Sequence, residues 1–173
     1  MTIEPQQLVE QGKQAFAAKQ YDRAASAFSE AATAYEAQDD VLNAAEAKNN
    51  LSVALLQAGK AQEAYQAAAG TDEVFAQAGD IKRQAMAFGN QAAALEALKK
   101  LDQALEAYER SAALFDEAGE GEMRSMVLQS AAAIKLKSGK MVDSALSMIG
   151  SVESTKKPNL LQRFLRFLLR LRS

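Results

Sequence analysis

Residues 79–120 read GDIKRQAMAFGNQAAALEALKKLDQALEAYERSAALFDEAGE, and this stretch decides the fold. When it is displaced by 40 residues, Phe115 falls on Phe75, and a second displacement brings it to Tyr35. Self-similarity at a fixed period of this length is typical of a repeat array, in which each unit packs against its neighbours. The same shift superposes three alanines, Ala104, Ala64 and Ala24.

Apolar residues within each repeat recur at intervals of three and four, which predicts amphipathic α-helices. Gly59, Gly79 and Gly119 are expected at helix ends, where a left-handed residue is needed. Asp40 and Asp80 are expected as N-caps of the helices that follow. The pattern predicts helices over residues 5–18, 21–38, 41–58, 61–78, 81–98, 101–118, 122–137 and 141–149.

These helices predict an all-α domain over residues 1–155. Its four antiparallel helix hairpins span about residues 5–39, 40–79, 80–119 and 120–152. Residues 156–173 are expected to form a separate basic amphipathic helix.

The charge balance argues against nucleic-acid binding. The chain has 20 basic and 22 acidic residues. Six of the basic residues and none of the acidic ones follow Glu153, so the preceding residues carry 14 basic against 22 acidic. Broad nucleic-acid binding needs positive charge along the docking surface.

The chain has no Cys and no His. It therefore has no thiolate nucleophile, and it lacks the commonest metal ligand and general base. The composition predicts a non-enzymatic protein without catalytic residues, metal or cofactor. The first residues lack a basic region followed by an apolar core, so no signal peptide is predicted and we expect a cytoplasmic protein.

The repeat resembles the tetratricopeptide repeat. The residues that carry the resemblance are Leu8, Gly12, Ala15, Tyr21, Ala24, Phe28 and Ala31 in the first unit, and Phe88, Ala92, Leu95, Leu101, Ala104, Tyr108 and Ser111 in the third. The period departs from the usual spacing of about 34 residues, and the closing proline is absent. The longer form is similar to the repeats of kinesin light chain and of membrane-fusion attachment proteins.

This resemblance implies a right-handed superhelix that binds a protein or peptide in a concave groove lined by the first helix of each hairpin. It does not extend to a clamp for a terminal carboxylate, because only Asn50 among five such positions matches. Asn50 and Asn90 share one repeat position and could hydrogen-bond a peptide backbone. The groove residues implied are Val9, Lys13, Phe16, Asn49, Asn50, Val53, Gln57, Asn90, Ala93, Glu96, Gln129, Ala133 and Lys137.

Residues 158–172 follow a different pattern, with a narrow basic arc and a wide apolar face. Eight large apolar side chains would contribute roughly 1.5–3 kcal/mol each on burial, so this helix needs a partner surface. Three alternatives remain open: a cap on the array, a second chain, or an anionic membrane surface to which the protein would be peripheral. The predicted contact residues are Leu161, Phe164, Leu165, Phe167, Leu168, Leu171, Arg163, Arg166 and Arg170.

The sequence therefore favours a protein-interaction scaffold or adaptor that holds a partner's peptide or helix in its groove. The alternative is a peripheral membrane adaptor anchored to anionic lipid by residues 158–172.

Overall fold

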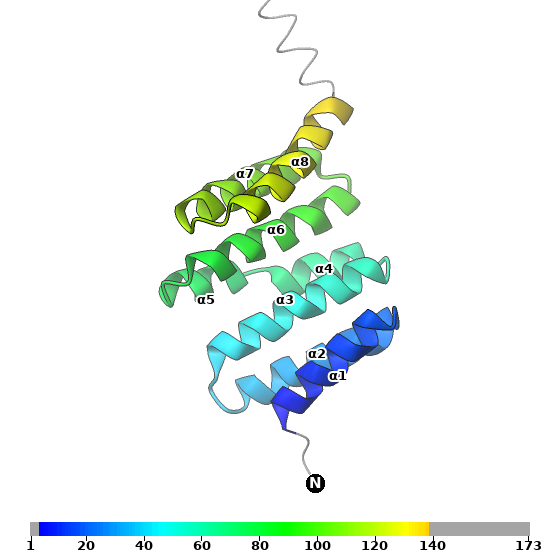
Figure 1. Cartoon of the computed structure of the whole chain (residues 1–173). Helices are drawn as coiled ribbons and strands as arrows, with labels where there is room; N and C mark the ends of the chain where they lie inside the picture. Colours follow the sequence, from blue (N-terminus) through cyan, green and yellow to red (C-terminus); the bar gives the residue numbers. More distant parts are fainter. Residues whose placement is uncertain (1–3, 139–173) are drawn as a thin grey trace, which may run out of the picture. The chain divides into compact units, whose positions relative to one another are not determined.

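A computed structural model describes residues 4–138, and within this range every regular element is an α-helix (Figure 1). The predicted all-α class is confirmed for this part of the chain. The helices are α1 (Pro5–Ala17), α2 (Tyr21–Glu36), α3 (Val41–Gln57), α4 (Ala61–Ala68), α5 (Thr71–Gln77), α6 (Ile81–Ala97), α7 (Leu101–Glu117) and α8 (Gly121–Lys137).

The chain divides into two compact units, Met1–Ala131 and Ala132–Ser173. The second unit is described only to residue 138, within and just after the last turns of α8. The predicted helix at 141–149, the boundary at 155 and the C-terminal helix with its contact residues lie outside the described residues.

One turn geometry recurs at intervals of 20 residues. At each turn a residue with a φ between 55° and 79° ends the helix. The next residue donates its backbone N–H to the carbonyl five positions back, as Lys60 does to Leu55 at 2.9 Å. This is the Schellman motif, which satisfies the last carbonyls of a helix and turns the chain away. The left-handed residues are Lys19, Asp39, Gly59, Gly79, Lys99 and Gly119.

Two of these turns also cap the helix that follows. The Asp40 carboxylate accepts the backbone N–H of Asn43 at 3.2 Å, and the Asp80 carboxylate accepts that of Arg83 at 2.9 Å. The Arg83 amide is the largest influence on the pKa of Asp80, which lies below its ordinary value. The Arg83 side chain also binds Glu46 Oε2 at 2.9 Å, which ties α6 to α3. Both predicted N-caps are confirmed.

The core of the first unit consists mainly of alanine and aromatic side chains. α2 packs against α1 and α3, α3 against α4, and α6 against α5 and α7, and both α3 and α4 also contact α6. Two sets of residues that the 40-residue shift superposes are buried in all three hairpins. Small side chains bring the helices close together, and each aromatic ring then fills the remaining volume. The superposed buried residues are Ala24, Ala64 and Ala104, followed by Tyr35, Phe75 and Phe115.

Gly12 in α1 shows how tight this packing is. A Cβ at this position would lie 2.6 Å from Cε1 of the Phe28 ring, closer than carbon atoms approach each other. The glycine therefore lets α1 approach α2 closely.

The predicted single helix over 61–78 is wrong, because the chain breaks between α4 and α5. Ala69 is extended with a ψ of 130°, and Gly70 is left-handed with a φ of 77°. Glycine adopts this conformation without a steric cost, and tertiary hydrogen bonds at the break satisfy the interrupted backbone.

The recurring turn predicts opposite effects on stability when glycine is introduced at one turn and removed from the equivalent turn. A left-handed conformation costs a residue with a Cβ about 1–2 kcal/mol. The larger unfolded-state entropy of glycine offsets about 0.4–1 kcal/mol of this, so Lys99→Gly is expected to raise the free energy of unfolding by up to about 1 kcal/mol. Gly59→Ala, 40 residues away, is expected to lower it by about 1 kcal/mol. Urea denaturation measures both, and destabilisation by Lys99→Gly would contradict the account.

Candidate functional site

Two open pockets occur where the first helices of neighbouring hairpins lie beside each other. The α1–α3 pocket has a volume of about 210 Å³ and is lined by Lys13, Phe16, Ala17, Phe28, Asn50 and Val53. The α6–α8 pocket has a volume of about 270 Å³ and is lined by Met86, Gly89, Asn90, Ala93, Tyr108, Phe115, Met123, Met126, Val127 and Ser130.

The two pockets occupy equivalent places in the 40-residue period. A displacement of 80 residues moves Phe28 of α2 onto Tyr108 of α7, and Asn50 onto Ser130. In both cases an aromatic ring from a second helix lies between two first helices. The pockets therefore follow from the repeat geometry, and their chemistry depends on the residues at the equivalent positions.

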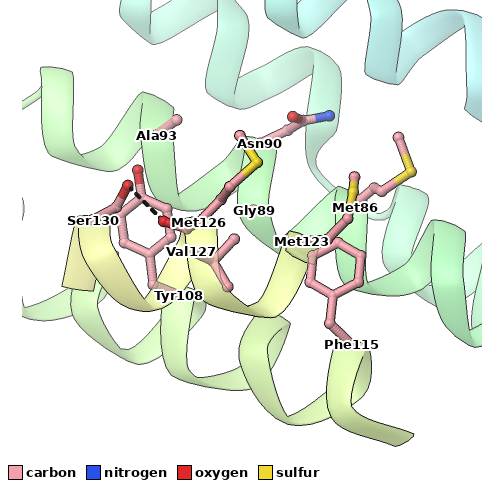
Figure 2. Close-up of a pocket in the computed structure, with 10 residues that line it drawn as sticks. All are labelled: Met86, Gly89, Asn90, Ala93, Tyr108, Phe115, Met123, Met126, Val127 and Ser130. Atoms are coloured by element: carbon pink, nitrogen blue, oxygen red, sulfur yellow. Dashed lines mark hydrogen bonds between the residues drawn. The ribbon is translucent and has the colours of Figure 1, made fainter. Parts of the chain in front are cut away.

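The α6–α8 pocket is apolar and carries no charged residue among its ten lining side chains. Figure 2 shows the rings of Tyr108 and Phe115 reaching from α7 into the space between α6 and α8. Met86 and Met126 lie at its rim, with 38% and 66% of their surface exposed. Methionine side chains are flexible and polarisable, so they adapt to differently shaped apolar partners.

The polar side chains of this pocket already have partners within the protein. Asn90 donates to Asn49 Oδ1 at 3.4 Å, and the Ser130 hydroxyl donates to the Met126 carbonyl at 3.5 Å. The Tyr108 hydroxyl donates to Glu96 Oε2 at 3.3 Å. Burial, followed by the charge of Glu96, raises the pKa of Tyr108 to about 12, so this hydroxyl keeps its proton at neutral pH.

The α1–α3 pocket combines an apolar wall with polar side chains that face solvent. Phe16 packs edge-on against Tyr21, with 5.4 Å between the ring centroids. Lys13 forms no ion pair and the Asn50 amide no hydrogen bond with the rest of residues 4–138. This pocket can therefore donate hydrogen bonds and a positive charge to a ligand, in addition to apolar contact.

Between these pockets, at the equivalent position in the second hairpin, the structure has Ala68 and the break between α4 and α5. The Thr71 hydroxyl lies 2.8 Å from the Ala68 carbonyl oxygen and 3.1 Å from Asn49 Oδ1, and donates its one proton to either. Gln91 donates to the same carbonyl at 3.1 Å and to Asp72 Oδ1 at 2.7 Å. This network satisfies the polar atoms that the break exposes within the core.

The structure distributes the predicted groove residues over several environments. Asn49 is buried, with 7% of its surface exposed, and its carbonyl oxygen is used internally. Val9 packs against the core, Glu96 bonds to Tyr108, Gln57 and Gln129 are exposed, and Ala133 belongs to the second unit. The side chain of Lys137 lies outside the described residues. Pocket-lining residues among those predicted are Lys13, Phe16, Asn50 and Val53 in one pocket and Asn90 and Ala93 in the other.

Asn50 and Asn90 therefore do not lie in one pocket, although they share a repeat position. The sequence analysis also missed most of the α6–α8 pocket, including Gly89 and the methionines. One signal was available in the sequence, because Met86 and Met126 are 40 residues apart.

Two further features are absent from residues 4–138. No cluster of three or more His, Cys, Asp or Glu side chains there could hold a metal ion. No helix of this range has the length and apolar character that crossing a membrane requires.

Comparison with known proteins gave no relative. No family model, no curated protein and no solved structure matches this chain.

The buried network predicts that Thr71→Val lowers the free energy of unfolding by about 1–3 kcal/mol, because the substitution removes the donor and leaves the buried acceptors less satisfied. Thr33→Val is the matched control, since the Thr33 hydroxyl also donates to a backbone carbonyl, at 3.1 Å, but at an exposed position. Its effect is expected to stay within about 0.5 kcal/mol. Equal effects in chemical denaturation would show that the network is energetically unimportant.

Proposed function

We propose that this chain is a non-enzymatic protein-interaction scaffold that holds a segment of a partner protein along the first helices α1, α3 and α6 and the start of α8. The single observation that carries this proposal is the pair of open, largely apolar pockets at equivalent positions of the 40-residue period. Concave sites with apolar walls and a few polar groups are typical of ligand binding. A repeated site suits a partner that extends over more than one unit.

The proposal includes a fold assignment. The left-handed residue at intervals of 20 positions supports a chain of similar helical hairpins, and the sequence resembles the long form of the tetratricopeptide repeat. We therefore assign the array to a right-handed superhelix of that type. Because folds of this kind carry sites for many partners, the lining residues identify the ligand better than the fold does.

Site-specific photo-crosslinking tests this function. A benzoylphenylalanine residue replaces Val53 in the α1–α3 pocket or Met86 in the α6–α8 pocket, within the full chain in its source cells. We expect the same discrete partner to be cross-linked from both positions, because one segment of the partner would pass both pockets. Mass spectrometry of the cross-linked peptides identifies it.

Matched control positions are Ser29 in α2 and Gln103 in α7, both exposed on second helices. These positions are expected to give no such product. If all four positions gave the same products, or none gave a product, the scaffold proposal would fail.

A second candidate function rests on the sequence of residues 158–172, which lie outside the described residues. Their basic arc and apolar face have the composition of helices that lie on anionic membranes. We propose, as the alternative, that the chain is an adaptor peripheral to a membrane.

The membrane alternative predicts salt-sensitive binding to anionic liposomes. Basic residues near such a surface contribute about 1 kcal/mol each, so replacing Arg163, Arg166 and Arg170 by Gln is expected to weaken co-sedimentation by about a hundredfold at low salt. The matched control replaces Lys19, Lys99 and Lys100, exposed residues of the described turns, and is expected to leave binding unchanged. Absence of binding by the unaltered full chain would exclude this alternative.

A further inference from the structure

The α6–α8 pocket differs from the α1–α3 pocket in the ligand that its chemistry accepts. We propose that the α6–α8 pocket binds the uncharged apolar face of an amphipathic α-helix of the partner protein, and that Gly89 keeps the pocket open for it. This inference rests on the scaffold function proposed above and names the class of ligand for one of its two pockets.

Hydrogen bonding distinguishes a helix from an extended peptide as the occupant. An extended segment needs donors and acceptors for its main chain, whereas a helix satisfies its own backbone. The three polar side chains of the pocket, Asn90, Tyr108 and Ser130, already donate to groups within the protein. Among these side chains the second N–H of Asn90 is the one donor left, so the pocket offers a ligand mainly apolar contact and oxygen atoms that can accept.

The absence of charged residues from the lining points to the same ligand. None of the ten lining residues is charged, so a charged side chain entering the pocket would lose hydration without gaining an ion pair. An uncharged apolar side chain has no such cost, and its burial is favourable. The face of the helix that enters this pocket is therefore apolar, while its charged residues remain in water.

The size of the pocket accommodates more than one side chain. Its volume of about 270 Å³ lies near the lower end of the roughly 300–1,000 Å³ that is typical of ligand pockets. Two apolar residues one helical turn apart project from the same face of a helix. Met86 and Met126, which are partly exposed at the rim (Figure 2), can adjust their rotamers around such a pair.

The presence of a glycine at position 89, inside α6, links the pocket to function. A glycine inside a helix costs about 1 kcal/mol relative to alanine, so its presence in α6 requires a reason. At Gly12 the reason is packing, as shown above. At Gly89 a Cβ would meet the nearest atoms, Ser111 Oγ and Val127 Cγ1, at 3.4 and 3.8 Å, which is ordinary contact. Packing therefore does not require this glycine, whereas a Cβ beside Val127 would narrow the pocket.

The test uses methyl NMR of the full chain labelled at its methionines. Three of the six methionines line the pocket, and the others, Met1, Met141 and Met148, lie outside the described residues. The first probe is a synthetic peptide of about 16 residues with leucines at i, i+3, i+4 and i+7 on an Ala/Lys/Glu background. The second contains the same residues in an order that scatters the leucines, and the third keeps the first order with a central proline.

The first probe is expected to shift the methyl resonances of Met86, Met123 and Met126 saturably, and the scattered and proline probes are expected to leave them unchanged. Gly89→Ala is expected to weaken binding of the first probe at least about threefold without lowering Tm, because alanine favours the helix while it narrows the pocket. A merely structural glycine would not separate affinity from stability in this way.

A second substitution makes the test independent of Gly89. Met126→Lys introduces a charge at the rim and is expected to weaken binding about tenfold. Leu136→Lys is the matched control, because Leu136 lies on the same helix with 65% exposure but does not line the pocket. Its affinity is expected to match that of the unaltered chain.

Several outcomes would overturn the inference. They are an absence of shifts, equal shifts with the scattered probe, or equal weakening by Leu136→Lys. If the pocket resonances moved with protein concentration alone, the occupant would be a second copy. If they moved on Phe164→Ser without a probe, the occupant would be the chain's own C-terminal segment. With any of these results, cross-links to a partner from position 53 would preserve the scaffold function, and the absence of cross-links from both position 53 and position 86 would remove it as well.

Discussion

The structure depends on one backbone constraint, the left-handed residue that ends a helix at intervals of 20 positions. At Gly59, for example, the chain leaves the helix, and the next amide returns to a carbonyl five residues back. The turn is short, so each helix must pack against the one before it. Because the turns are alike, some residues 40 positions apart are buried in the same way, as the alanines Ala24, Ala64 and Ala104 show.

The same constraint creates the candidate sites. Equivalent turns orient equivalent helix faces in the same way in each hairpin. A pocket between two first helices can therefore recur wherever the second helix supplies an aromatic ring, such as Phe28 or Tyr108. The substitutions at those equivalent positions then determine the chemistry. Lys13 and Asn50 make one pocket polar at its edge, whereas Ala93 and Ser130 leave the other without charge. A repeated geometry with different linings can therefore hold different parts of one partner.

The middle of the array is the exception that separates the two pockets. Gly70 ends α4 early, and the polar atoms that this break exposes are satisfied by Thr71 and Gln91. Asn49 is drawn into the same network and is buried. In this region a hydrogen-bonded core takes the place of the apolar pocket. Leaving such a core partly satisfied is costly, because the interior has a low effective dielectric constant.

Within residues 4–138 the sequence by itself determined the helices other than the broken one at 61–78, the stops at Gly59, Gly79 and Gly119, and the caps at Asp40 and Asp80. These features depend on local periodicity and on the backbone preferences of single residues. It did not reveal that Lys19, Asp39 and Lys99 adopt the same left-handed conformation, since their side chains do not signal it.

Only the tertiary structure decided the rest. A helix of 61–78 and its broken form have the same apolar pattern, and the broken form is chosen by hydrogen bonds to residues of α3 and α6. The α6–α8 pocket likewise depends on which side chains of three helices meet. Periodicity predicts the face of a helix on which a residue lies. It does not predict how far apart the faces of two helices lie when those helices are distant in sequence.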